Sequence, residues 1–185
     1  EFFDDLRTVL IPFQDPQRYG RSVLENSSFL VSSANPNPDL HGRGFYGRLS
    51  GSTAEWVHLW VHMNLGGAPF TLGEDGELRF QMRPALPAWM FSRTPGTAAW
   101  LRSGREQQAP LPEHHYAFVL FNKTLVVYVN PTGRDTVGPK APTMRRVELT
   151  TDDGRAHTMA PAELKGRIAR NVRDGEFRTI TAFFE

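Results

Sequence analysis

Residues 116–129 read YAFVLFNKTLVVYV, and this stretch decides the fold class of the second half of the chain. Two apolar runs rich in β-branched and aromatic residues, 116–121 and 124–129, are separated only by Asn122-Lys123. Such a pattern predicts a β-hairpin, although Asn-Lys is a weaker turn signal than Asn-Gly. Strands are therefore the expected main element around this hairpin.

Further strand signals lie on both sides of the predicted hairpin. Apolar and polar residues alternate, or apolar residues cluster, in three more short runs, and these are residues 78–80, 146–149 and 177–184. Between the last two, Pro161 is expected to open a short helix that Gly175 closes. Several short strands joined by turns favour a C-terminal antiparallel β-sandwich over residues 73–185.

A helix is expected ahead of the strands. The sequence Ser52-Thr53-Ala54-Glu55 has the pattern of a capping box, in which the serine accepts from a free helix N–H and the glutamate reaches back. Trp56, Trp60 and Met63 then share one face, and Gly66-Gly67 ends the run. A second, N-terminal helix is expected over residues 2–10. Because it is already under way at residue 1, we expect the chain to be a fragment of a longer protein.

Composition narrows the class of protein. The chain has 185 residues, of which 39% are hydrophobic and 22% charged, the balance of a globular protein. Its net charge of +1 gives no basic excess for binding a nucleic-acid backbone. It has no cysteine, so disulfides and thiolate metal sites are excluded. With neither a signal-peptide pattern nor a run of about 18 apolar residues, we expect a cytoplasmic protein without a membrane partner.

Residues 19–56 hold the densest mixture of glycine, polar and aromatic side chains. Ser50, Gly51 and Ser52 run into the expected helix, whose N-terminus offers unpaired N–H groups to an anion. The candidate phosphate site is completed by positive side chains in the loop before it, and these are His41, Arg43 and Arg48. The alternative is that the serines only cap the helix, which is their commonest use.

Other candidates have an equally plain alternative. Glu25 and Asn26 could bind sugar hydroxyls, or Glu25 could pair with Arg21 on a solvated turn. Trp89 and Trp100 lie near prolines where loops could wall a pocket, or they could simply pack. His58 and His62 are four residues apart, but Leu59 stands where a metalloprotease motif needs glutamate, so no metal site is expected.

Three runs of sequence resemble the C-terminal part of the inverting glycoside phosphorylase family that contains cellobiose phosphorylase and 1,2-β-oligoglucan phosphorylase. The runs are YGRSVLENSSF (19–29), NPDLHGRGFYGRLSGSTAEW (37–56) and DGELRFQMRPALPAWMF (75–91), and the likeness continues weakly through FVLFNKTLVVYVNPTGRDT (118–136). The resemblance implies an α+β fragment. Residues 1–72 would supply the last helices and loops of an (α/α)6 barrel, and residues 73–185 the β-sandwich.

The resemblance also implies a reaction. In this family inorganic phosphate cleaves a terminal β-glucosidic bond with inversion and gives α-D-glucose 1-phosphate, with no other cofactor. Ser50-Gly51 matches a Thr-Gly pair that helps to hold phosphate, and His41 is the nearest match to a phosphate-binding histidine. The general acid of the family is an aspartate in an earlier barrel segment. No aspartate here matches that motif, so the catalytic residues are unknown and the chain alone is expected to be inactive.

The expected partners are therefore a β-glucan or oligosaccharide, phosphate, and the remainder of the barrel in the same or a companion polypeptide. Two alternatives stay open. One is a fragment of an inverting glycoside hydrolase or transglycosylase on the same scaffold. The other is a non-catalytic sugar-binding β-sandwich.

Overall fold

The computed structural model describes residues 29–30, 33–41, 44–45 and 50–185. Contacts divide the chain into two compact units, Glu1–Val57 and His58–Glu185. The predicted assignment of residues 1–72 to a barrel and 73–185 to a sandwich stays a prediction, and the predicted helix over residues 2–10 lies outside the described residues.

In the first unit, two short strands, β1 (Phe29–Leu30) and β2 (Gly44–Phe45), pair in antiparallel fashion. Between them a 3₁₀ turn, η2 (Pro38–Leu40), is capped by Asn37, whose Oδ1 accepts the Asp39 N–H at 3.0 Å. An asparagine side chain and a proline start this turn, as is common in loops.

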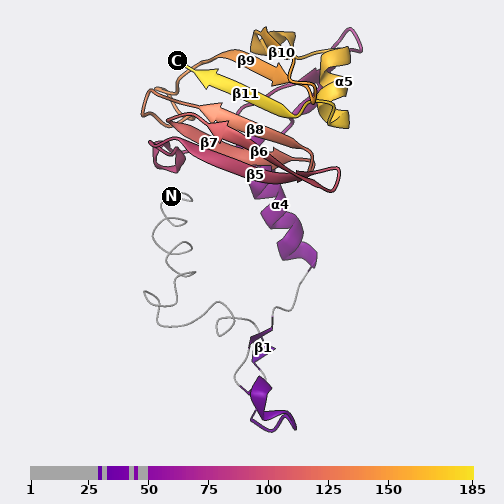
Figure 1. Cartoon of the computed structure of the whole chain (residues 1–185), viewed down its shortest axis with the longest axis vertical. Coiled ribbons are helices and arrows are strands. Elements are labelled where there is room, and N and C mark those ends of the chain that lie inside the picture. Colours follow the sequence, from indigo (N-terminus) through magenta and orange to yellow (C-terminus); the bar gives the residue numbers. More distant parts are fainter. Residues whose placement is uncertain (1–28, 31–32, 42–43, 46–49) are drawn as a thin grey trace. The chain divides into compact units, whose positions relative to one another are not determined.

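The second unit is built on a five-stranded sheet with the order β10-β9-β11-β8-β7 (Figure 1). Its strands are β7 (His115–Leu120), β8 (Thr124–Val129), β9 (Met144–Thr150), β10 (Ala156–Met159) and β11 (Thr179–Phe184). The predicted runs 78–80 and 146–149 lie in strands, and the run 177–184 is a strand from Thr179 onward. The expected antiparallel sandwich is wrong in one respect, since β11 runs parallel to β8. The long connection through β9, β10 and a helix lets the chain return in the same direction.

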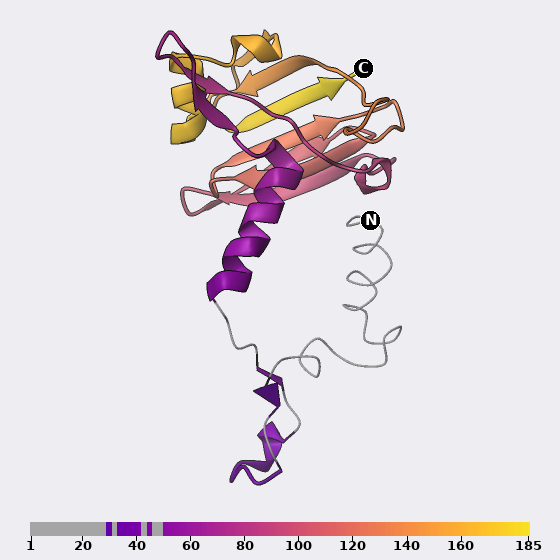
Figure 2. The same ribbon diagram turned by 180° about the vertical axis from the view of Figure 1, so that it is seen from behind.

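Both faces of the sheet are covered. All six residues of β8 are buried, with Val126 and Tyr128 in one core cluster and Leu125, Val127 and Val129 in the other. The hairpin of β5 (Gly96–Arg102) and β6 (Arg105–Leu111) covers one face (Figure 1). The C-terminal turns of α4 (Ser50–Leu65), the β3–β4 hairpin (Phe70–Leu72 and Leu78–Phe80) and α5 (Arg167–Asp174) cover the other (Figure 2). The α+β class is confirmed.

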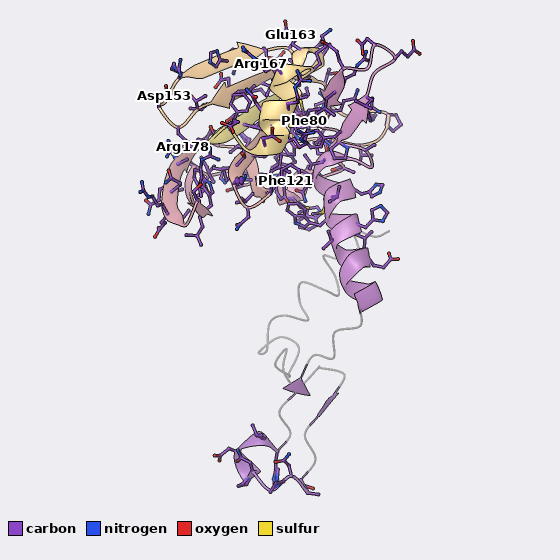
Figure 3. All side chains as sticks on the ribbon, turned by 90° about the vertical axis from the view of Figure 1, so that its right-hand side faces the viewer. Phe80, Phe121, Asp153, Glu163, Arg167 and Arg178 are labelled. Atoms are coloured by element: carbon purple, nitrogen blue, oxygen red, sulfur yellow. The ribbon has the colours of Figure 1, made fainter. Side chains whose placement is uncertain are left out.

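The predicted β7–β8 hairpin is present, but its turn lies one residue earlier than expected. The Lys123 N–H donates to the Leu120 carbonyl at 3.1 Å, and the two residues between them, Phe121 and Asn122, have φ of 53° and 54°. Positive φ at both central residues marks a type I′ turn. Phenylalanine is a poor residue for this conformation (Phe121 is labelled in Figure 3). Its ring stacks on that of Phe70, with the ring centroids 6.0 Å apart.

Helix α4 begins at Ser50. Ser52 therefore lies inside the first turn and is not the predicted N-cap. The predicted end is confirmed, because the Gly66 N–H closes on the His62 carbonyl at 3.1 Å with φ of 89° at Gly66. Trp60 meets Phe118 of β7 edge to face at 5.2 Å, as expected for the apolar side of this helix.

The helix expected from Pro161 is interrupted. A 3₁₀ turn, η4 (Pro161–Glu163), is followed by an extended segment, and α5 starts at Arg167. The interruption arises because this segment pairs with β4: the Phe80 N–H donates to the Leu164 carbonyl at 2.8 Å and the Gly166 N–H to the Leu78 carbonyl at 2.7 Å. The predicted stop at Gly175 is confirmed, with left-handed backbone.

The described residues contain no helix long and apolar enough to cross a membrane.

Candidate functional site

The predicted phosphate-binding residues Ser50, Gly51 and Ser52 form the first turn of the 16-residue helix α4. The N–H groups of a first turn have no acceptor within the helix and carry the positive end of its dipole. The predicted residues thus occupy the first turn of the helix, which is the position that anion binding at a helix N-terminus requires.

His41 follows the η2 turn, with its backbone N–H bound to the Pro38 carbonyl at 3.1 Å. Its ring Nε2 lies 2.8 Å from the Asn35 carbonyl, so this nitrogen carries the proton and faces the loop. Nδ1 is left for a ligand. The remaining predicted site residues, Glu25, Asn26, Arg43 and Arg48, lie outside the described residues.

His58 and His62 lie on the exposed side of α4 with their Nε2 atoms 2.9 Å apart. They are the nearest approach to a metal site, but in the described part of the chain no group of three or more histidine, aspartate or glutamate side chains converges. Two histidines alone do not make the closed four-ligand site of structural zinc.

A hollow in the second unit is lined by residues from three separate segments of the chain. We call it the Trp89 hollow; it has a volume of about 260 Å³, and its lining is Ala88, Trp89, Phe91, Arg93, His114, Asn130, Gly133 and Asp135. A second hollow of about 460 Å³, the Lys140 hollow, is lined by Gly133, Arg134, Asp135, Val137, Pro139 and Lys140. Because both are lined by Gly133 and Asp135, they adjoin, and together we call them the loop groove.

The floor of the loop groove is held by hydrogen bonds. Trp89 lies in a short 3₁₀ turn, η3 (Ala88–Met90), and the Ala88 N–H donates to Asp135 Oδ1 at 2.8 Å. Thr136 binds the neighbouring segment twice: its N–H donates to the Leu86 carbonyl at 2.9 Å, and its Oγ1 accepts the Leu86 N–H at 2.8 Å. The loop after β8 is thereby fixed to the turn that carries the indole.

Asn130 fixes the inside of the same loop. It is 2% exposed, and its Nδ2 donates to the Arg134 carbonyl at 2.8 Å while its Oδ1 accepts the Thr132 hydroxyl at 2.6 Å. Its own N–H donates to the carbonyl of His114, a residue with φ of 57°. A non-glycine residue at positive φ is held there by its surroundings, so this wall is preorganised.

The side chains that line the loop groove are mostly unpaired. Among the described residues, no ion pair or side-chain hydrogen bond is made by Arg93, Arg134 or Lys140. Trp89 is 38% exposed. The groove thus combines a partly exposed indole with one carboxylate and three cationic side chains that are unpaired among the described residues, on a rigid floor.

A third hollow, also about 460 Å³, is of a different kind. It is lined by Arg102, Ser103, Arg105, Gln107 and Asp152, and we call it the Arg102 junction. Arg102 donates to both carboxylate oxygens of Asp152 at 2.8 and 2.9 Å and to the Gly175 carbonyl at 2.9 Å. These bonds hold the pKa of the Asp152 carboxyl below its usual range. The hydrogen-bond donors of the guanidinium are thus used within the fold, where they join four segments of the chain.

Tyr128 is the most deeply buried titratable group described, and it too is structural. Its hydroxyl donates to the Asn64 carbonyl at 2.7 Å, near the end of α4, and burial raises its pKa well above the ordinary value. A neutral phenol in this position anchors the helix to the sheet.

Sequence reasoning noted Trp89 but missed Asp135, Arg93 and Arg134. The turn chemistry of Asn130-Pro131-Thr132-Gly133 was a signal for a shaped loop after the hairpin. Trp100, the other tryptophan considered for a pocket, is 5% exposed and packs between the β5–β6 hairpin and the sheet. For Trp100, the packing alternative holds.

Comparison of the chain with models of known protein families and with curated proteins gave no match.

Proposed function

We propose that the chain is the phosphate- and sugar-binding part of an inverting glycoside phosphorylase, which converts β-glucosides or β-glucans and inorganic phosphate into α-D-glucose 1-phosphate. The proposal rests on the sequence resemblance and on one structural observation. The Ser50-Gly51 pair stands at the start of a 16-residue helix, where an anion meets free N–H groups and a glycine without a side chain to block it.

In such a reaction a phosphate oxygen forms a bond to the anomeric carbon as the glycosidic C–O bond breaks, and an acid gives its proton to the leaving oxygen. An inverting hydrolase needs a base as well, to activate water. Phosphate is already an anionic nucleophile, so the protein's task is to position it. The first turn of α4 would do this. The acid belongs to a part of the longer protein that precedes this chain.

The proposal includes phosphate as co-substrate, no other cofactor and, since the chain has no cysteine, a reducing compartment such as the cytoplasm. A second candidate, a sugar-binding module without catalysis, is favoured by the loop groove, whose indole and unpaired donors lie in the second unit.

The test is phosphate release from α-D-glucose 1-phosphate with a β-glucan acceptor, measured for the 185-residue chain and for the longer polypeptide. Release by the longer polypeptide alone is the expected result. In it, Ser50→Ala should lower the rate about 100-fold, the usual cost of losing one fixed donor to a reacting anion. Ser92→Ala, in the second unit, should leave the rate unchanged. Equal rates for the two variants would remove Ser50 from the site.

A further inference from the structure

We propose that the loop groove is a binding site for an oligosaccharide of two or more hexose units, separate from the phosphate-binding turn of α4. This deepens the proposed function, on which it rests only for the choice of glucan probes. It is supported by the shape, the rigidity and the exposed side chains of the groove.

The shape of the loop groove suits an oligosaccharide. The combined volume of the two hollows falls within the range of about 300 to 1,000 Å³ that is common for ligand sites. Gly133 and Asp135 line both, so a ligand can run from one hollow into the next. Two adjoining compartments suit a chain of repeating units better than one compact molecule.

The side chains that line the loop groove suit the chemistry of a sugar ring. One face of a pyranose ring presents C–H groups and packs on an aromatic plane, while its hydroxyls radiate outward and need donors and acceptors. The groove has this combination, with the partly exposed indole of Trp89 on one side and the Arg93 guanidinium and the Asp135 carboxylate around it. Asp135 uses Oδ1 for the Ala88 N–H, and no hydrogen bond to its Oδ2 is made by the described residues. An acceptor is therefore available for a vicinal hydroxyl.

The backbone of the loop groove is already fixed in place before a ligand binds. The backbone that carries Asp135 is bound to the Trp89 turn by Thr136 and by the carboxylate itself, and Asn130 holds the loop from within. Sugars bind weakly because their hydroxyls must give up water, so a site that needs no ordering is favoured. Arg93 and Arg134 stay unpaired among the described residues, although surface carboxylates pair with other arginines of the same unit.

The experiment is calorimetric titration of the 185-residue chain with cellotetraose and laminaritetraose in phosphate-free buffer. At least one should bind with a dissociation constant below about 1 mM. Trp89→Ala should weaken that binding at least about ten-fold, and Trp89→Phe, which keeps an aromatic plane, should weaken it less. Asp135→Asn keeps an acceptor for the Ala88 N–H and should weaken binding several-fold through loss of the charge.

Trp60 provides a matched control, because its exposed fraction is 38%, the same as that of Trp89. Trp60→Phe should leave binding unchanged. The proposal is overturned if neither tetraose binds, if Trp60→Phe and Trp89→Phe weaken binding equally, or if inorganic phosphate at the same concentration displaces the tetraose, which would make the groove an anion site. Since no catalysis is measured, loss of phosphorolysis and loss of this site are distinguishable.

Discussion

The Lys140 hollow and the Arg102 junction have the same volume, about 460 Å³, yet their polar groups are used in opposite ways. At the junction, one guanidinium is 10% exposed and binds a carboxylate and backbone carbonyls from three other parts of the chain. In the loop groove, the cationic side chains are exposed and unpaired among the described residues, and the hydrogen bonds lie beneath them in the backbone and in Asn130.

The volume of a hollow therefore does not by itself identify a binding site. An arginine whose donors are all satisfied within the fold has none left for a ligand, and its role is stability. A cation held above a rigid floor without a partner adds little to stability. The two regions should therefore respond to mutation in opposite ways.

The largest effect is expected at the junction. Arg102→Ala should lower the free energy of unfolding by about 3 kcal/mol, because the Gly175 and Lys123 carbonyls lose their donor and the stem of the arginine is no longer packed. Urea unfolding followed by tryptophan fluorescence measures this. Arg105→Ala, on the exposed side of the same turn, is the control and should change stability by less than about 0.5 kcal/mol. Similar losses for the two variants would refute the assigned role of Arg102.

The next effect concerns the floor of the groove. Asn130→Ala should lower the free energy of unfolding by about 2 kcal/mol, since the Arg134 carbonyl and the Thr132 hydroxyl lose a buried partner. It should also weaken tetraose binding, because the loop loses its internal support. Arg145→Ala, at an exposed residue of β9 that does not line the groove, should do neither. If Asn130→Ala left both quantities unchanged, the groove would not be preorganised by this residue.

A smaller effect should appear as acid dependence at the junction. The folded pKa of Asp152 is depressed, so its contribution to stability is full above its unfolded pKa of about 3.9 and is lost as the pH falls through the folded value. Asp152→Asn should therefore make the free energy of unfolding fall less steeply below about pH 4. In an Arg102→Met background the same change should have no such effect. If Asp152→Asn still changed the pH dependence of the free energy of unfolding in the Arg102→Met background, the effect would not come from the Arg102–Asp152 pair.

The smallest effect on stability is expected in the groove, where the effect on binding should be clearest. Arg93→Ala and Arg134→Ala should each change the free energy of unfolding by less than about 0.5 kcal/mol and weaken tetraose binding several-fold. Thermal unfolding and calorimetry on the same samples give both quantities. If either variant lost as much stability as Arg102→Ala and still bound the tetraose, the loop groove and the Arg102 junction would not differ in the way described.

The parts of the fold that could be predicted from the sequence are those with local signals. The β7–β8 hairpin follows from two uninterrupted apolar runs, and the end of α4 from Gly66-Gly67. The β5–β6 hairpin was missed, because alanine, glutamine and proline are poor strand signals. Its pairing depends on the burial of Trp100 and on a Ser-Gly turn with positive φ at both residues.

The loop groove could not be predicted for a different reason. Trp89, His114 and Asp135 lie far apart in the sequence, and they line one hollow because the loop after β8 binds the segment before η3. No sequence pattern records such a contact. Of the predicted phosphate site, the helix turn at Ser50-Gly51 is described, while Arg43, Arg48, Glu25 and Asn26 remain predictions.

In the longer polypeptide we expect phosphate, and not water, to cleave the glucosidic bond. The most direct test is to incubate that polypeptide with a β-gluco-oligosaccharide, with and without inorganic phosphate, and to follow the products by NMR. We expect no cleavage without phosphate, and α-D-glucose 1-phosphate as a product when phosphate is present. Free glucose released in phosphate-free buffer would contradict this expectation and identify a hydrolase on the same scaffold, and an inverting one if the first product is α-glucose.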